Sequence, residues 1–158
     1  MSVSAVKKYL SAWGKESQVL EFTVSSATVT LAAEALETSP ARIAKTLAFA
    51  KENSCMLVVT AGDARIDNRR FKAQFGMKAK MLDAETIFSM TGHPVGGVCP
   101  FALPDATISV FLDTSLKRFE TVFPACGSPN SAIELAIEEL QTIARSSGWV
   151  DVCSGWTT

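Results

Sequence analysis

The chain has 158 residues, of which 47% are hydrophobic, and it carries a formal net charge of −1. This length and apolar content suit one domain, residues 1–158, that buries roughly 70% of the surface its unfolded form exposes. The net charge excludes a protein drawn to nucleic acid by its overall charge. Because no apolar run is long enough for a signal peptide or a membrane span, we expect a cytoplasmic protein.

The N-terminal third of the chain alternates helix-forming and strand-forming segments. Ser4 can cap a first helix that runs to Trp13, and residues 18–22 read as a short strand. The alanine and leucine content of residues 29–36 favours a second helix. Ser39-Pro40 is a helix start, with serine as N-cap and proline in the first position, and we expect this short helix to end near Lys45.

The middle of the chain predicts a hairpin followed by helices and short strands. Residues 46–51 and 55–61 are apolar, β-prone runs joined by a polar turn, as in an antiparallel hairpin. Asp67 or Asn68 and then Asp83 can cap two further helices. The remaining predicted elements are helices ending near residues 75 and 90 and strands at residues 78–82, 107–112 and 121–125. Short strands and helices without regular alternation indicate a mixed α+β fold.

A constrained loop follows the second of these helices, where residues 91–103 read TGHPVGGVCPFAL. Glycines let main-chain N–H groups approach a ligand, and prolines fix the path of the chain, so the expected occupant is a carbonyl, carboxylate or phosphate oxygen. The alternative is a tight turn between a helix and a strand.

Lys45 stands in an apolar stretch, ARIAKTLAF, at residues 41–49. A partly buried lysine keeps its charge only beside an anion or a carbonyl, which makes Lys45 a candidate for gripping a substrate. The alternative is a surface lysine at a helix end, where a cation interacts well with the last carbonyls.

Three segments together resemble one known family. The IAKTLAF run, the Gly-Gly-x-x-Pro-Phe loop and the CGSPNSAIEL segment resemble the YbaK/EbsC family, which includes the editing domain of bacterial prolyl-tRNA synthetases. The resemblance runs from about Ser25 to Trp156. It implies a single aminoacyl-tRNA editing domain, an α/β fold with a curved mixed sheet surrounded by helices, and hydrolysis of mischarged tRNA of the Cys-tRNA(Pro) or Ala-tRNA(Pro) type. It also implies that residues 132–135 form a strand and that only the residues after them are helical.

The resemblance also implies roles for particular residues. Lys45 would orient the aminoacyl group or the adjacent phosphate. Main-chain N–H groups of Gly96 and Gly97 would hold the ester carbonyl as an oxyanion hole. The other residues implied in substrate binding are Thr46, Val98, Cys99, Pro100, Phe101, Asp113, Gly127 and Ser128. For Asp113, a turn cap is the competing interpretation.

A basic cluster is the expected tRNA contact, and a solvated helix face is its alternative. Its members are Arg65, Arg69, Arg70 and Lys72, with Lys78 and Lys80 beyond them. The expected partners are the aminoacylated acceptor end and an aminoacyl-tRNA synthetase, with no membrane, DNA, cofactor or metal, and we expect a monomer.

Two other functions stay open from the sequence. The same fold could serve as a non-catalytic module that binds an aminoacylated end or an amino-acid-like ligand. A nucleophile and base pair formed by Cys99 and His93 is the third reading. The four cysteines form no C-x-x-C pair, which favours reduced thiols over a disulfide frame.

Overall fold

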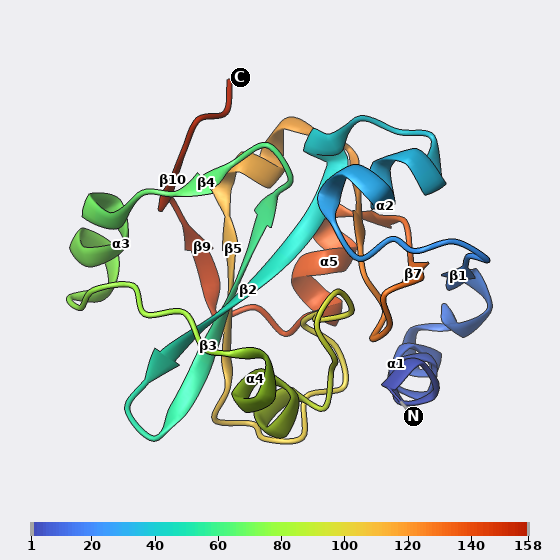
Figure 1. The fold of residues 1–158 in the computed structure, drawn as a ribbon, viewed down its shortest axis with the longest axis horizontal. Coiled ribbons are helices and arrows are strands. Elements are labelled where there is room, and N and C mark those ends of the chain that lie inside the picture. The colour runs from blue at the N-terminus through green and yellow to red at the C-terminus, as the bar shows by residue number, and fades with distance from the viewer. Residues whose placement is uncertain (1, 158) are drawn as a thin grey trace.

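The computed structural model describes residues 2–157, and its centre is a six-stranded mixed sheet in the order β8-β6-β2-β3-β5-β9. The pairs β2-β3 and β6-β8 are antiparallel, and the other neighbours are parallel. Figure 1 shows β2 and β3 crossing the middle of the molecule with a strong twist. The strands are β2 (Ile43–Lys51), β3 (Ser54–Ala61), β5 (Ser109–Asp113), β6 (Thr121–Pro124), β8 (Leu135–Ala136) and β9 (Gly148–Val150). The predicted curved mixed sheet is confirmed.

Two small sheets flank the central one. Strand β1 (Leu20–Glu21) pairs with β7 (Ser131–Ala132), and β4 (Arg65–Ile66) pairs with β10 (Cys153–Ser154). The second pair ties the chain's last strand to the segment that follows β3 (Figure 1).

The helices begin and end where local capping groups allow it. They are α1 (Ser2–Leu10), α2 (Val29–Leu36), α3 (Asn68–Phe75), α4 (Ala84–Thr91) and α5 (Ile137–Ile143). The side chains of Thr28, Asp67 and Asp83 each accept hydrogen bonds from the first-turn N–H groups of α2, α3 and α4. The predicted helices at 29–36, 67–75 and 83–90 are confirmed. None of the helices in residues 2–157 is long and apolar enough to cross a membrane.

Several sequence-based boundaries were wrong. The turn opened by Pro40 is a 3-10 helix that ends at Arg42, so Lys45 lies inside β2 and not at a helix end. Residues 78–82 form no strand, and only a single bridge joins Met81 to Phe49. Helix α1 includes Ser2 and Val3, so Ser4 lies inside it and does not cap it. Strands β4, β9 and β10 were not predicted.

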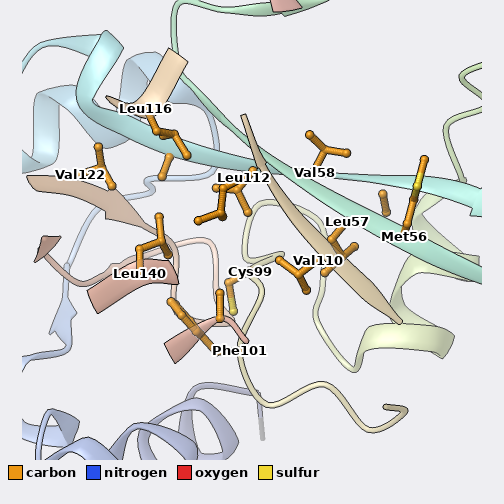
Figure 2. Close-up of a cluster of buried hydrophobic side chains, with 14 of the residues drawn as sticks. Met56, Leu57, Val58, Cys99, Phe101, Val110, Leu112, Leu116, Val122 and Leu140 are labelled. Atoms are coloured by element: carbon orange, nitrogen blue, oxygen red, sulfur yellow. The ribbon is translucent and has the colours of Figure 1, made fainter. Parts of the chain in front are cut away.

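A continuous core includes successive residues of β3, Cys55 to Val59, so it packs against both faces of the sheet, and Figure 2 shows part of it. Cys99 and Phe101, from the glycine-rich loop, lie in this core, and both are fully buried. All four cysteines are buried free thiols, as the reduced state predicts. The glycine-rich loop is therefore anchored at both ends, since Thr91 and His93 are buried as well, while Val95, Gly96 and Val98 between them stay at least partly exposed.

Candidate functional site

A cavity of about 270 Å³ opens at the edge of β2. Its lining comes from four stretches that are distant in sequence, and most of the contributing side chains are small or apolar. The lining residues are Ser26, Ala27, Thr28, Val29, Ala32, Ile43, Ala44, Lys45, Thr46, Leu47, Ile87, Val95, Gly96, Val98, Phe123, Ala125, Ser131 and Ala132. The cavity is sized for a small group with limited polarity.

Lys45 lines this cavity, and its ammonium is held at the loop that follows β3. Every residue from Ile43 to Leu47 lines the cavity, so this stretch of β2 forms one of its walls. The Lys45 Nζ donates a hydrogen bond to the carbonyl oxygen of Ala64 at 2.6 Å. Burial lowers the pKa of the Lys45 ammonium below its ordinary value, while the nearby Asp63 carboxylate acts to raise it.

Asp63 forms a bidentate ion pair with Arg118. Two guanidinium nitrogens of Arg118 donate to its two carboxylate oxygens at 2.6 and 2.9 Å. These hydrogen bonds lower the pKa of Asp63. Arg118 also donates to the carbonyl of Thr157 and stacks over Trp156, so the C-terminal segment braces the loop that holds the Lys45 ammonium.

The glycine-rich loop turns sharply at the cavity wall. The Gly97 N–H donates to the Pro94 carbonyl at 2.9 Å, and Gly96 has φ +85°, a left-handed value that glycine adopts easily at the third position of such a turn. The Gly97 carbonyl accepts from the Gly127 N–H at 3.0 Å. Among residues 2–157, the N–H groups of Gly96 and Val98 have no hydrogen-bond acceptor, and both residues line the cavity.

Four of the residues predicted to form the site line this cavity together: Lys45, Thr46, Gly96 and Val98. Gly97 lies behind the wall, where a Cβ would meet the main-chain nitrogen of Ser128 at 2.4 Å. The remaining predicted substrate contacts do not line the cavity, and they are Cys99, Pro100, Phe101, Asp113, Gly127 and Ser128.

Asp113 has a local role in the structure. It is fully buried, and its carboxylate accepts the N–H of Ser115 at 3.0 Å and the N–H of Val152 at 2.9 Å. These bonds cap the 3-10 turn (Thr114–Arg118) after β5 and hold the approach to β10.

His93 and Cys99 do lie together, with Nε2 and Sγ 3.4 Å apart. Both side chains are buried outside the cavity lining, and His93 Nε2 lies 2.7 Å from the Phe101 carbonyl. Burial raises the pKa of the Cys99 thiol to about 12 and lowers the pKa of His93. A neutral thiol beside a neutral imidazole is a poor nucleophile.

The predicted basic cluster lies on α3 and the segments around it. Arg69 and Lys72, together with Lys78, line one surface hollow, and all three are exposed. Arg70 is engaged by the Asp151 carboxylate at 3.1 Å and by the Cys153 carbonyl. The exposed part of the cluster is therefore available to an anionic partner, while Arg70 holds β10 in place.

Sequence reasoning missed the wall formed by residues 26–29 and by the ends of β6 and β7. The local signal for this wall was the run of small residues before α2. Small side chains are needed there, because Gly96 packs so closely on Ala27 that a Cβ on Gly96 would approach the Ala27 Cβ to 2.8 Å. Among the described residues, no group of three or more His, Cys, Asp or Glu side chains could hold a metal ion.

Comparison with known proteins gives consistent matches. The model of the aminoacyl-tRNA editing domain matches residues 23–143. An uncharacterized protein of Bacillus subtilis, YwhH, is 50% identical over 157 residues, with 99% of each chain covered. A proline–tRNA ligase of Desulfotalea psychrophila is 27% identical over 70 residues, which cover 44% of this chain and 12% of the ligase.

The solved structures add a match over the whole fold. A protein described as a candidate trans-editing enzyme for prolyl tRNA synthetase superimposes with a TM-score of 0.87 at 25% identity, with 98% of each chain covered. A hypothetical protein, APE2540, gives a TM-score of 0.79 at 28% identity, covering 92% of this chain and 99% of its own.

Proposed function

We propose a reaction from the premise that the chain belongs to the aminoacyl-tRNA editing domain family. In this proposal the protein is a trans-editing deacylase that hydrolyses the ester bond of a mischarged tRNA. The observation that carries the proposal is the pair of unengaged N–H groups, at Gly96 and Val98, in one small cavity with the Lys45 side chain.

The two N–H groups suit the charge that develops during ester hydrolysis. Water adds to the ester carbonyl carbon, and negative charge collects on the carbonyl oxygen until the bond to the ribose oxygen breaks. Fixed donors directed at that oxygen stabilise this charge, and one such donor is typically worth about 3 kcal/mol in the barrier. Gly97 contributes by letting the turn pack directly on the main chain of residues 127–128.

Lys45 supplies a positive charge at the end of the cavity. Its ammonium is held by the Ala64 carbonyl in the free protein, and a phosphate or ester oxygen of the tRNA end is a stronger acceptor than a neutral carbonyl. Exchange of one acceptor for the other would orient the aminoacyl end. Its burial, which disfavours the charged form, is an added reason for Lys45 to prefer an anionic partner.

The proton of the attacking water ends on the ribose oxygen that leaves when the ester bond breaks. The lining contributed by the described residues includes no carboxylate, imidazole or thiol. The neighbouring hydroxyl of the terminal ribose lies next to the ester and can relay this proton, and in a cysteinyl substrate the thiol lies there as well. An aminoacyl ester is already activated, so positioning and the oxyanion donors can account for the rate.

A small amino acid on tRNA(Pro) is the substrate that this proposal favours. The cavity is lined mainly by small and branched apolar side chains, which suits an alanyl or cysteinyl group better than a large or charged one. The exposed Arg69, Lys72 and Lys78 offer contacts for the tRNA phosphates.

The test is release of amino acid from mischarged tRNAs, beginning with Ala-tRNA(Pro) and Cys-tRNA(Pro), without added metal. We expect release by the wild type, its loss in Lys45→Ala, and wild-type rates in Lys51→Ala, a matched lysine on the same strand. As a control, circular dichroism and thermal unfolding would check that Lys45→Ala is folded.

Either of two results would reject the proposal. Full activity of Lys45→Ala would remove the role of the ammonium. Tight binding of aminoacyl-tRNA with no release from any tRNA would make the chain a non-catalytic binding module. The second result would agree with the absence of a base in the described lining.

A further inference from the structure

The edge of β2 is interrupted where it passes the cavity. Strand β6 pairs with β2 only at Ile43 and Ala44. Beyond the gap, the Ala48 carbonyl accepts the Leu82 N–H at 3.2 Å, and the Ala50 N–H donates to the Lys80 carbonyl at 2.8 Å. The stretch between these two contacts, residues 45–47, has no neighbouring strand on this side.

The direction of each main-chain group along β2 follows from its pairing with β3. In an antiparallel pair, successive residues alternate between bonding to the partner strand and pointing away from it. Ala48 and Ala50 bond on the side away from β3, and Thr46 has the same parity. The N–H and C=O of Thr46 therefore point into the interruption.

The interruption and the cavity coincide. Thr46 lines the cavity together with Gly96 and Val98. Among residues 2–157, neither main-chain group of Thr46 has a partner on this edge. A strand edge that lacks its neighbour is a ready site for an extended, peptide-like group, and an aminoacyl ester is such a group.

We propose that the main-chain carbonyl of Thr46 accepts a hydrogen bond from the α-amino group of the substrate, so that the site acts on esters of free amino acids. This inference rests on the proposed function and adds a substrate class to it. With the ester carbonyl on the Gly96 and Val98 N–H groups, the α-carbon lies between the loop and β2. Esters with a hydroxyl in its place, or with an acylated amino group, can donate only an uncharged and therefore weaker hydrogen bond.

Binding tests the inference without requiring turnover. The probes are stable amides of 3′-amino-3′-deoxyadenosine that carry an alanyl group, an isosteric lactyl group or an N-acetylalanyl group. We expect the alanyl probe to bind about tenfold more tightly than the lactyl probe, the ratio by which a hydrogen bond from a charged donor typically exceeds one from a neutral hydroxyl. Equal affinities for these two probes would overturn the inference.

A main-chain substitution tests the Thr46 carbonyl as an acceptor without changing any side chain. An α-hydroxy analogue of leucine at position 47 turns the Thr46 carbonyl into an ester, a weaker acceptor, and removes one sheet N–H. An α-hydroxy analogue of phenylalanine at position 49 removes an equivalent sheet N–H and alters the Ala48 carbonyl instead. We expect the alanyl preference to fall only in the first protein, and an unchanged preference there would reject the role of Thr46.

The side chain of Thr46 provides a further control, because its hydroxyl is buried without a partner among the described residues. Thr46→Val should keep the alanyl preference, and its loss would assign recognition to the hydroxyl and overturn the inference. Failure of the proposed function looks different: the alanyl probe would still be preferred, while alanyl-tRNA would not be hydrolysed.

Discussion

Replacing Gly97 with alanine should damage both stability and activity, because this glycine lies directly against another stretch of main chain. A Cβ at Gly97 would approach the Ser128 nitrogen to 2.4 Å and the Gly127 carbonyl carbon to 2.6 Å. Main-chain atoms cannot rotate away as a side chain does, so the glycine-rich loop and the turn at 127–128 must separate.

The size of the effect follows from the interactions that this separation disrupts. Overpacking of this kind costs about 1–3 kcal/mol, and separation also breaks the 3.0 Å bond between the Gly127 N–H and the Gly97 carbonyl, worth about 1 kcal/mol. A total of about 2–4 kcal/mol corresponds to a fall in Tm of roughly 5–15 °C for a chain of this length. Displacement of one oxyanion donor lowers kcat by roughly a hundredfold or more.

The assay combines thermal unfolding with deacylation of a mischarged tRNA, and Gly14→Ala is the matched control. Gly14 has φ +69° and no atom within 4 Å of an added Cβ, so alanine there adds the backbone cost of about 1–2 kcal/mol without a clash. Gly97→Ala with wild-type activity, or with stability equal to that of Gly14→Ala, would show that the loop does not depend on this contact.

Three further predictions concern charges. The chain has one histidine, and because burial depresses the pKa of His93 in the folded state, the unfolded chain binds more protons below about pH 6.5. The free energy of unfolding should therefore fall as the pH drops through that value, and His93→Gln should flatten the dependence in urea titrations; a steeper dependence would contradict the assignment. The Asp63 carboxylate acts to raise the pKa of Lys45, so Asp63→Asn should move the alkaline loss of kcat/KM to lower pH, and an unmoved limb would separate Lys45 from the rate. Replacing Arg69 and Lys72 with alanine should weaken tRNA binding and reduce its salt slope by roughly 1 to 2, with aminoacyl-adenosine hydrolysis unchanged; an unchanged slope would remove these residues from the tRNA contact.

Helix positions could be predicted from the sequence because their signals are local. The carboxylates of Asp67 and Asp83 bond to N–H groups two or three residues away, so a few residues suffice to define each helix start. The reliance on local signals also led to Lys45 being placed near a helix end, because Ser39-Pro40 predicts the start of a helix. The start of β2 depends instead on Ile43 pairing with Phe123, far along the chain.

The site could be predicted only in part. Lys45 and the glycine-rich loop stand out as segments, but the orientation of each N–H depends on the turn at 127–128 and on where β6 leaves β2. The same dependence explains why Gly97 was predicted as an oxyanion donor, whereas its N–H is used within the turn. Strands β9 and β10 were missed because their partners, β5 and β4, are not visible from their own short sequences.

The cavity walls lie at residues 26–32, 43–47, 87–98 and 123–132, and this order along the chain has a consequence for folding. Contacts between such distant segments form late, because the entropy of closing long loops must be overcome before the contacts contribute. The hairpin of β2 and β3 can form early, but the cavity exists only after β6 has joined β2 in parallel. During refolding, the cavity should therefore form in a late phase, and a nascent chain still attached to the ribosome before β7 emerges lacks one of the cavity walls.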